Sequence, residues 1–225
     1  MHVELVVTGD GSHTLYNPRL KEHYHSTFGA IQESKYIFIG SGLLYFPDHS
    51  DLTVFEVGFG TGLNALLTLL EAEHHSIKIN YTAIEPSPLA DTIYMQLNYP
   101  YLLGLQKSLP LFKAIHEAPF QKTKTITPGF SLTKIKGKLE NYIIAPRSVD
   151  LVYFDAFSPE VQPELWTEKI FRKLYGAMKP GGILVTYSAK GSVGRALNLA
   201  EFNVEKLPGP PGKREITRAL KAARK

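Results

Sequence analysis

Three closely spaced glycines between an apolar strand and an apolar helix constrain this chain more than any other feature. Residues 53–57 have the β-branched and aromatic content of a buried parallel strand, and leucines then repeat at helical spacing, at Leu63, Leu66, Leu67 and Leu70. Between them lie Gly58, Gly60 and Gly62. Without Cβ atoms they allow a tight turn, and a ligand can lie against amides at the helix N-terminus. The pattern predicts a nucleoside-cofactor site in an α/β fold.

The spacing of the glycines distinguishes two kinds of cofactor. A dinucleotide fingerprint places its third glycine three residues after its second, whereas Gly60 and Gly62 are two apart and Glu56 precedes the loop. The pattern resembles motif I of the S-adenosylmethionine (AdoMet) methyltransferases. This resemblance implies cofactor contacts from Glu56, Gly58, Phe59, Gly60, Thr61, Gly62 and Asn64. The alternative is an ordinary strand–turn–helix with incidental glycines.

A second acidic residue follows at the end of the next apolar run. Glu85 lies 23 residues after Gly62 and directly follows residues 79–84. A carboxylate at a strand end can accept hydrogen bonds from both ribose hydroxyls, as in dinucleotide folds. We therefore expect Glu85 to bind the cofactor ribose.

Length and composition favour one catalytic domain. A chain of 225 residues with 44% hydrophobic content can bury a full core, and with no cysteine it forms neither disulfides nor cysteine-ligated zinc. The N-terminus lacks a basic, apolar leader, and no apolar run is long enough to span a bilayer, so we expect no membrane association and a cytoplasmic protein. Histidines 23, 25, 74 and 75 lack an acid or cysteine at ligand spacing, so no metal is expected.

Basic residues are unevenly distributed, although the net charge is only +4. Five lysines and no acid lie between Gln121 and Lys138, and six of the last thirteen residues are Lys or Arg. Such clusters attract phosphates, which makes a nucleic-acid partner worth considering. From the charge alone, solvated lysines on a hairpin are the favoured explanation.

The remaining pattern alternates strand and helix, as a doubly wound sheet requires. We expect a helix carrying Leu89, Ile93 and Leu97 that Pro100 ends, then a connection leading to a hairpin around residues 127–129. Further elements are expected at 149–154 (strand), 163–178 (helix), 183–188 (strand), 193–200 (short helix), and 202–207 with 215–220 (antiparallel hairpin). The expected fold class is α/β, a Rossmann-like AdoMet-dependent methyltransferase fold. Its doubly wound, mostly parallel sheet has seven strands with a reversed last strand. Residues 1–50 are expected to form an extension that packs on a methyltransferase domain at 51–225.

Asp155 is the candidate catalytic residue. It ends the apolar run 149–154, and ligands of open α/β sheets bind at the carboxyl ends of strands. A turn-forming or helix-capping aspartate is the alternative. Phe157 could stack on a planar base or belong to the core, whereas Trp166 shares a helical face with apolar residues and is expected in the core.

The loop from Asp155 to Trp166 resembles the methyltransferase component of the MnmC-type tRNA-modifying enzymes. Further segments that resemble this family are residues 33–39, 55–64, 186–195 and 212–215. The resemblance implies AdoMet as the cofactor. It also implies that Asp155 contacts both the cofactor and the methyl acceptor, and that the substrate is contacted by Phe157, Ser188, Arg195, Lys213 and Arg214. The chain departs from the family pattern at Gly194-Arg195, where paired arginines are usual. It also has Lys136-Gly-Lys-Leu-Glu140 where many methyltransferases place an adenine-binding acid.

The resemblance implies methylation of the aminomethyl nitrogen at C5 of the wobble uridine in tRNA, with the anticodon loop as partner. The chain is too short to include the flavin oxidoreductase domain of some members, so separate enzymes that install the aminomethyl group would supply the amine. Three alternatives remain: an aminopropyltransferase of the spermidine-synthase type, another small-molecule or protein methyltransferase, and a non-catalytic RNA-binding module. Glu56, Glu85 and Asp155 argue against the last.

Overall fold

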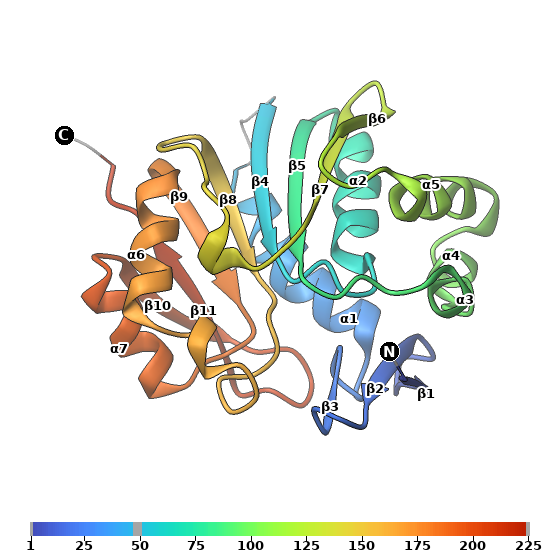
Figure 1. Cartoon of the computed structure of the whole chain (residues 1–225), viewed down its shortest axis with the longest axis horizontal. Helices are drawn as coiled ribbons and strands as arrows, with labels where there is room; N and C mark the ends of the chain where they lie inside the picture. The colour runs from blue at the N-terminus through green and yellow to red at the C-terminus, as the bar shows by residue number, and fades with distance from the viewer. Residues whose placement is uncertain (1, 47–50, 224–225) are drawn as a thin grey trace.

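An eight-stranded sheet runs through the centre of the molecule, with helices on both faces (Figure 1). The structure is a computed structural model that describes residues 2–46 and 51–223. Its large-sheet strands are β4 (Asp51–Val57), β5 (Lys78–Glu85), β6 (Thr123–Thr127), β7 (Phe130–Lys136), β8 (Val149–Phe154), β9 (Met178–Thr186), β10 (Asn203–Pro208) and β11 (Glu215–Leu220). The main helices are α2 (Leu63–His75), α5 (Leu105–Glu117), α6 (Glu168–Ala177) and α7 (Gly191–Leu199).

The strand order is β10-β11-β9-β8-β4-β5-β7-β6. The strands from β7 to β9 pair in parallel, whereas β11 runs antiparallel to both β9 and β10, which confirms the reversed last strand. The expected number of seven strands is wrong. The eighth strand, β6, pairs antiparallel with the outer edge of β7, because the expected hairpin at residues 127–129 adds its first arm to the sheet.

Each face of the large sheet has its own hydrophobic core. One core packs α2 and α5 against β4 and β5, and the other packs α6 and α7 against β8 and the opposite side chains of β4. Trp166 is buried in the second core, where its ring packs edge-on against Phe154, so the core assignment is confirmed. Within the described residues, no helix is both long and apolar enough to cross a membrane.

Two helical predictions differ from the structure. The helix expected to end at Pro100 is instead α3 (Asp91–Tyr94) followed by α4 (Tyr99–Leu102), where Pro100 lies in the first turn because its missing N–H is not needed there. The expected connection contains α5, which Pro110 does not prevent from forming. The helix expected at 163–178 begins as the short turn η4 (Pro163–Leu165), and α6 starts after Thr167, whose Oγ1 caps it by accepting from the Ile170 N–H.

A small second sheet belongs to the N-terminal segment. It comprises β1 (Glu4–Val7), β2 (His13–Asn17) and β3 (Glu22–His23), and is followed by α1 (Ala30–Ser34) and the helical turns η1 (Lys35–Gly40) and η2 (Leu43–Tyr45). In Figure 1 this segment lies below the large sheet, on the side where β4, β5 and β8 end. The expected boundary at residue 50 falls at residues 47–50, outside the described part of the chain.

Candidate active site

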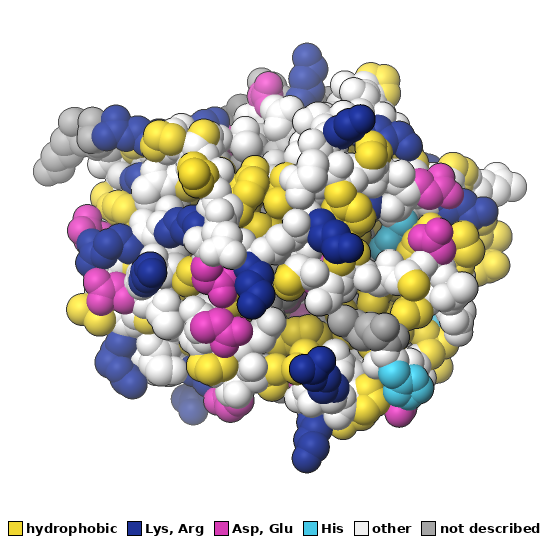
Figure 2. Space-filling view, in the orientation of Figure 1, with side chains coloured by type: hydrophobic (Ala, Val, Ile, Leu, Met, Phe, Trp, Pro, Cys, Tyr) yellow, Lys and Arg dark blue, Asp and Glu magenta, His cyan; other side chains and the backbone are white. Residues whose placement is uncertain are grey.

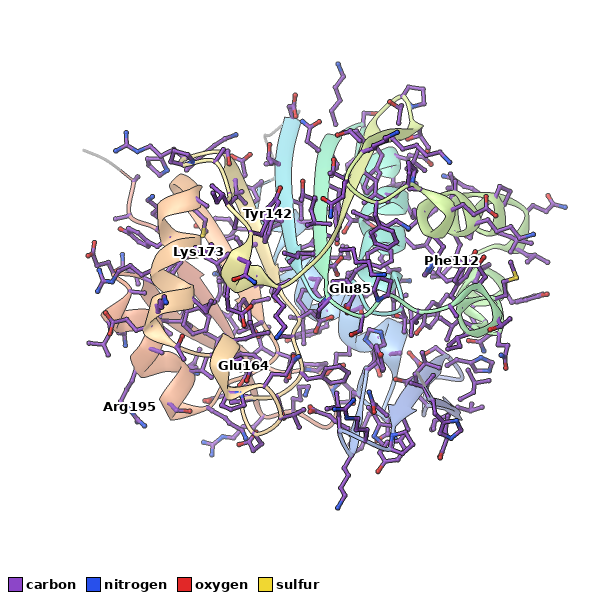
Figure 3. The ribbon with its side chains drawn as sticks, in the orientation of Figure 1. Glu85, Phe112, Tyr142, Glu164, Lys173 and Arg195 are labelled. Carbon is purple, nitrogen blue, oxygen red and sulfur yellow. The ribbon has the colours of Figure 1, made fainter. Side chains whose placement is uncertain are left out.

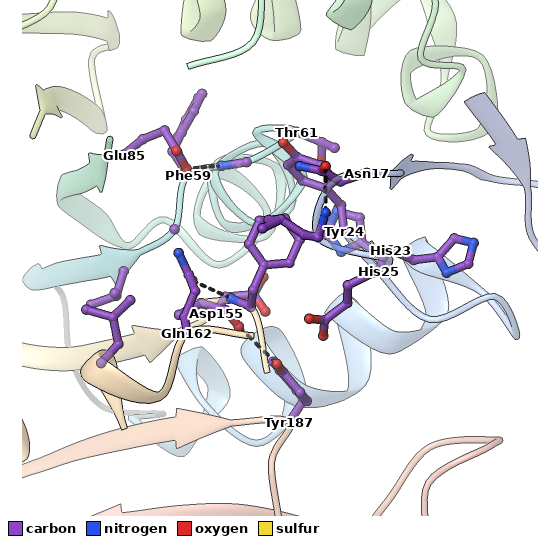
Figure 4. Close-up of a pocket in the computed structure, with 18 of the residues that line it drawn as sticks. Asn17, His23, Tyr24, His25, Phe59, Thr61, Glu85, Asp155, Gln162 and Tyr187 are labelled. Atoms are coloured by element: carbon purple, nitrogen blue, oxygen red, sulfur yellow. Dashed lines mark hydrogen bonds between the residues drawn. The ribbon is translucent and has the colours of Figure 1, made fainter. Parts of the chain in front are cut away.

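A cavity of about 460 Å³ opens at the carboxyl ends of β4, β5 and β8 (Figure 4). Its size suits a small organic ligand. One wall is the glycine loop, another is the segment from Glu85 to Ser87, and a third begins at Asp155. The N-terminal segment closes the remaining side with residues between Asn17 and Glu33.

The glycine loop has a backbone that side-chain-bearing residues rarely adopt. Gly58, Gly60 and Gly62 have φ angles of +90°, +49° and +73°. At Gly58 space is also lacking, since a Cβ atom there would lie 2.5 Å from the Asp155 carbonyl oxygen. The Gly58 N–H donates to the Ile84 carbonyl at 3.0 Å, and the Asp155 N–H donates to the Val57 carbonyl at 2.9 Å. These contacts hold the ends of three neighbouring strands together.

Glu85 lies at the end of β5 with its carboxylate beside the loop. One oxygen accepts from the Gly60 N–H at 3.2 Å and the other from the Ser87 N–H at 2.8 Å. Burial raises the pKa of Glu85, and the two N–H donors partly oppose this shift. The carboxylate still borders the cavity, so its remaining lone pairs can accept hydrogen bonds from a ligand.

Asp155 borders the same cavity and is joined to Glu56 through Asn64. The Asn64 side-chain nitrogen donates to Asp155 Oδ2 at 2.8 Å and to Glu56 Oε1 at 3.0 Å. Burial, reinforced by the negative charge of Glu33, raises the pKa of Asp155 to about 7. The pKa of Glu56, which is fully buried, is also raised by burial and by Asp155. Asp155 can therefore exchange a proton near neutral pH.

The structure gathers most of the predicted site residues around this cavity. The lining includes Gly58, Phe59, Gly60, Thr61, Asn64, Glu85, Asp155, Phe157 and Lys213. Glu56 and Gly62 lie behind the lining, and Ser188 is buried. Arg195 is exposed on α7 and points away from Glu85 in Figure 3. Arg214 is exposed next to Lys213 but does not line the cavity. Residues 137–140, which follow β7, also line it.

The N-terminal segment supplies residues that sequence reasoning missed. Tyr24 packs edge-on against Phe157, and its ring lies where a Cβ on Gly60 would touch it. The His25 ring nitrogen Nε2 lies 2.8 Å from Thr61 Oγ1, and burial lowers the pKa of His25 to about 4. Glu22 accepts hydrogen bonds from the Ser158 N–H and hydroxyl. No local spacing relates these residues to the glycine loop, so no motif could have indicated them.

Two expectations about polar clusters need correction. The lysines of the β6–β7 hairpin are not all solvated, because Lys134 is buried, donates to the His116 carbonyl and lies over the Phe59 ring. Burial lowers its pKa to about 8.

The histidine pair of α2 does have an acid at ligand spacing, since His75 Nε2 lies 3.0 Å from Glu71 Oε1. His74 completes a cluster whose ligand atoms lie within 4.8 Å of one another.

Comparisons with known proteins agree with this geometry. A family described as S-adenosyl-L-methionine-dependent methyltransferase matches residues 111–222. The chain is 29% identical, over 95% of its length, to the tRNA 5-methylaminomethyl-2-thiouridine biosynthesis bifunctional protein MnmC of Cupriavidus metallidurans. It is 30% identical, over 90% of its length, to the protein of that name in Cupriavidus necator. It spans only about a third of each of these relatives, 33% and 32%.

Two solved structures share the fold of this chain to different degrees. The crystal structure of MnmC2 from Aquifex aeolicus superposes with a TM-score of 0.83 and 27% identity, covering 99% of this chain and 71% of that one. A probable spermidine synthase from Corynebacterium glutamicum has a TM-score of 0.53 and 15% identity, with 98% of this chain and 76% of that chain covered. The second likeness is one of fold alone.

Proposed function

We propose that this chain, which belongs to the MnmC-type family of S-adenosyl-L-methionine-dependent methyltransferases, methylates the aminomethyl nitrogen at C5 of a wobble uridine in tRNA. The observation that carries the proposal is the position of Asp155. Its carboxylate borders the cavity that the glycine loop and Glu85 also line, and it has a pKa of about 7. A group of that kind suits an acceptor that must lose a proton before it reacts.

The residues around the glycine loop fit the AdoMet cofactor. Glycines leave the loop backbone open to the cavity, and Glu85 presents carboxylate oxygens for the ribose hydroxyls. When bound, AdoMet supplies an electrophilic methyl group on a sulfonium. The protein therefore has to hold the acceptor in line, exclude water and manage one proton.

We expect Glu85→Ala to weaken AdoMet binding, because the ribose hydroxyls would lose their acceptor at a cost of about 1–3 kcal/mol. Gly60→Val should weaken it as well, since its side chain would meet the Tyr24 ring and the ligand. Isothermal titration calorimetry measures both. Glu160→Ala, at an exposed glutamate outside the cavity lining, is the control. Unchanged affinity in both site variants would refute the cofactor assignment.

Asp155 handles the proton in the proposed reaction. An alkylammonium acceptor would transfer one proton to the Asp155 carboxylate, and its freed nitrogen lone pair would then take the methyl group that bound AdoMet would supply, with the electrons of the methyl–sulfur bond left on sulfur. The secondary ammonium product keeps the positive charge of the acceptor, and Asp155 releases its proton to solvent. The amine must be present beforehand, so an enzyme that installs aminomethyl groups on uridine acts earlier.

The proposed RNA surface surrounds the cavity mouth. Lys138 lines the cavity and is exposed, and Arg214 is exposed in the loop between β10 and β11. Figure 2 shows Lys and Arg side chains on several sides of the hollow in this face, with acidic side chains among them. Lys213, by contrast, lies 3.3 Å from Glu33 within the cavity lining, so Arg214 is the better phosphate contact of the two.

Lys138→Ala/Arg214→Ala should weaken tRNA binding and flatten its dependence on salt by about one to two phosphate contacts. Fluorescence anisotropy across a salt series measures the slope. Lys78→Ala removes an exposed lysine at the opposite, amino end of β5 and should leave the slope unchanged. An unaltered slope in a well-folded double variant would exclude these phosphate contacts.

Nucleoside mass spectrometry tests the function itself. Purified protein and AdoMet should add one methyl group to the aminomethyluridine of tRNA from cells that lack the methylation step. If the protein instead transfers an aminopropyl group from decarboxylated AdoMet to putrescine, the spermidine-synthase alternative is correct. Failure of both transfers, with AdoMet bound, would refute the proposed acceptor.

A further inference from the structure

Three of the carboxylates that line the cavity come from distant parts of the chain: Glu22, Glu33 and Asp155. Two of them have hydrogen-bonded roles within the protein. Glu22 accepts from Ser158, and Asp155 accepts from Asn64. The third, Glu33 on α1, accepts from the Ser26 N–H through Oε2 at 2.8 Å, but its Oε1 is buried and accepts no hydrogen bond among the described residues.

A lysine ammonium faces this unused oxygen. Lys213 Nζ lies 3.3 Å from Glu33 Oε1 and 4.7 Å from the centre of the Tyr187 ring. The Tyr187 hydroxyl donates to the carbonyl of Ala156, the residue after Asp155. An ammonium group in this place therefore has a carboxylate on one side and an aromatic face on the other, which is how proteins bind amine cations.

The contact between Lys213 and Glu33 lacks hydrogen-bond geometry, so it is a weak attachment for a buried carboxylate. The Lys213 side chain is 28% exposed and has a flexible stem, whereas the Glu33 side chain is 10% exposed and fixed through Ser26. The lysine can leave for solvent, but the glutamate cannot. Its departure would leave a buried negative charge without a cation, which is costly unless another cation replaces it.

We propose that Glu33 receives the ammonium group of the methyl acceptor, and that Lys213 occupies this position until the acceptor arrives. The inference rests on the proposed function and deepens it, because it assigns a second carboxylate to acceptor binding. Glu33 binds the incoming ammonium, and Asp155 takes its proton. The arrangement selects acceptors with a positive charge and leaves unmodified uridine without a partner for Glu33.

The test compares two anticodon stem-loop RNAs that are identical except for 5-aminomethyluridine or uridine at the wobble position. Fluorescence anisotropy at pH 6.5, with S-adenosylhomocysteine present, gives the ratio of their dissociation constants. Wild type should prefer the aminomethyl RNA by about tenfold or more, the scale of a charged hydrogen bond. Glu33→Gln should lose most of this preference and bind the unmodified RNA as before. Glu160→Gln, outside the cavity lining, should behave as wild type.

Lys213→Met removes the competing ammonium, keeps the stem and should increase the preference several-fold. A retained preference in Glu33→Gln, or a lost one in Lys213→Met, would overturn the inference. If Glu33→Gln fails to fold, the Lys213→Met result decides alone, and an unchanged ratio refutes the inference. Wild-type protein that methylates the aminomethyl RNA but shows no preference refutes only this inference. Wild-type protein that methylates neither RNA refutes the proposed function.

The pH dependence of turnover provides an independent readout. The ionisable groups that influence or face Asp155 are Glu33 from α1, Glu56 from β4, Tyr81 from β5, Tyr187 after β9 and Lys213 from the β10–β11 loop. Removing the Glu33 charge should lower the pKa of Asp155, so the acidic limb of the rate profile moves to lower pH. Lys213→Met removes a positive charge and should move that limb to higher pH. Shifts of equal sign in the two variants would contradict the proposed arrangement.

Discussion

Asp155→Asn is expected to reduce the rate of methyl transfer by roughly 10²-fold or more, the usual scale for losing a general base. The amide keeps the size of the side chain but cannot take up a proton from the acceptor. AdoMet affinity should remain nearly intact, because the substitution leaves Glu85 and the glycine loop, the proposed cofactor contacts, unchanged. Single-turnover measurements and calorimetry separate the two effects. Asp51→Asn makes the same change at the opposite end of β4 and should be silent.

The wild-type rate should rise as the pH increases through about 7, since only ionised Asp155 accepts a proton. Stability should change in the opposite direction. The folded protein holds this proton more tightly than the unfolded chain, whose aspartate has a pKa near 3.8, so the free energy of unfolding falls as the pH rises from about 4 to 7. Asp155→Asn should remove that part of the slope. A near-normal single-turnover rate in this variant would make Asp155 a structural residue.

The sequence predicts the centre of the site because its signals are local. The strand before Gly58, the helix after Gly62 and the two strand-end acids Glu85 and Asp155 all follow from short-range patterns. Parallel pairing of β4 with β5 and β8 then brings their carboxyl ends to one edge of the sheet. Short-range patterns and parallel pairing are therefore enough to predict that the glycine loop, Glu85 and Asp155 lie close together.

The rest of the site depends on tertiary structure that no local pattern specifies. Tyr24 and Glu33 line the cavity because the N-terminal segment, with its small sheet and α1, packs near the strand ends. Their spacing in the sequence does not indicate this packing. Lys134 belongs to a run of lysines that suggests solvent exposure, yet β7 pairs on both sides and the rings of Phe120 and Phe59 lie beside its ammonium. Helix α5 was missed because Pro110 interrupts the pattern of a helix whose buried side includes Phe112 and Ile115.

Gly58→Ala should have the second large effect, a loss of stability with two causes. One is the left-handed backbone at Gly58, and the other is the close approach of the Asp155 carbonyl. A comparison with Gly104→Ala separates the two causes. Gly104 has a φ of +85°, close to the +90° of Gly58, but a Cβ on Gly104 would meet nothing within 4 Å. Gly104→Ala should therefore lower the free energy of unfolding only by the cost of a left-handed backbone at alanine, about 1–2 kcal/mol.

At Gly58 the added Cβ also meets the Asp155 carbonyl oxygen at 2.5 Å, and backbone cannot move aside as a side chain can. We expect a total loss of about 3–5 kcal/mol in the free energy of unfolding, the range of severe single substitutions. Any variant protein that still folds must separate the ends of β4 and β8. Asp155 would then move relative to Asn64, and turnover should fall further than in Gly104→Ala. Urea denaturation and single-turnover rates measure both quantities, and equal losses in the two variants would show that the close approach of these strand ends does not hold Asp155 in place.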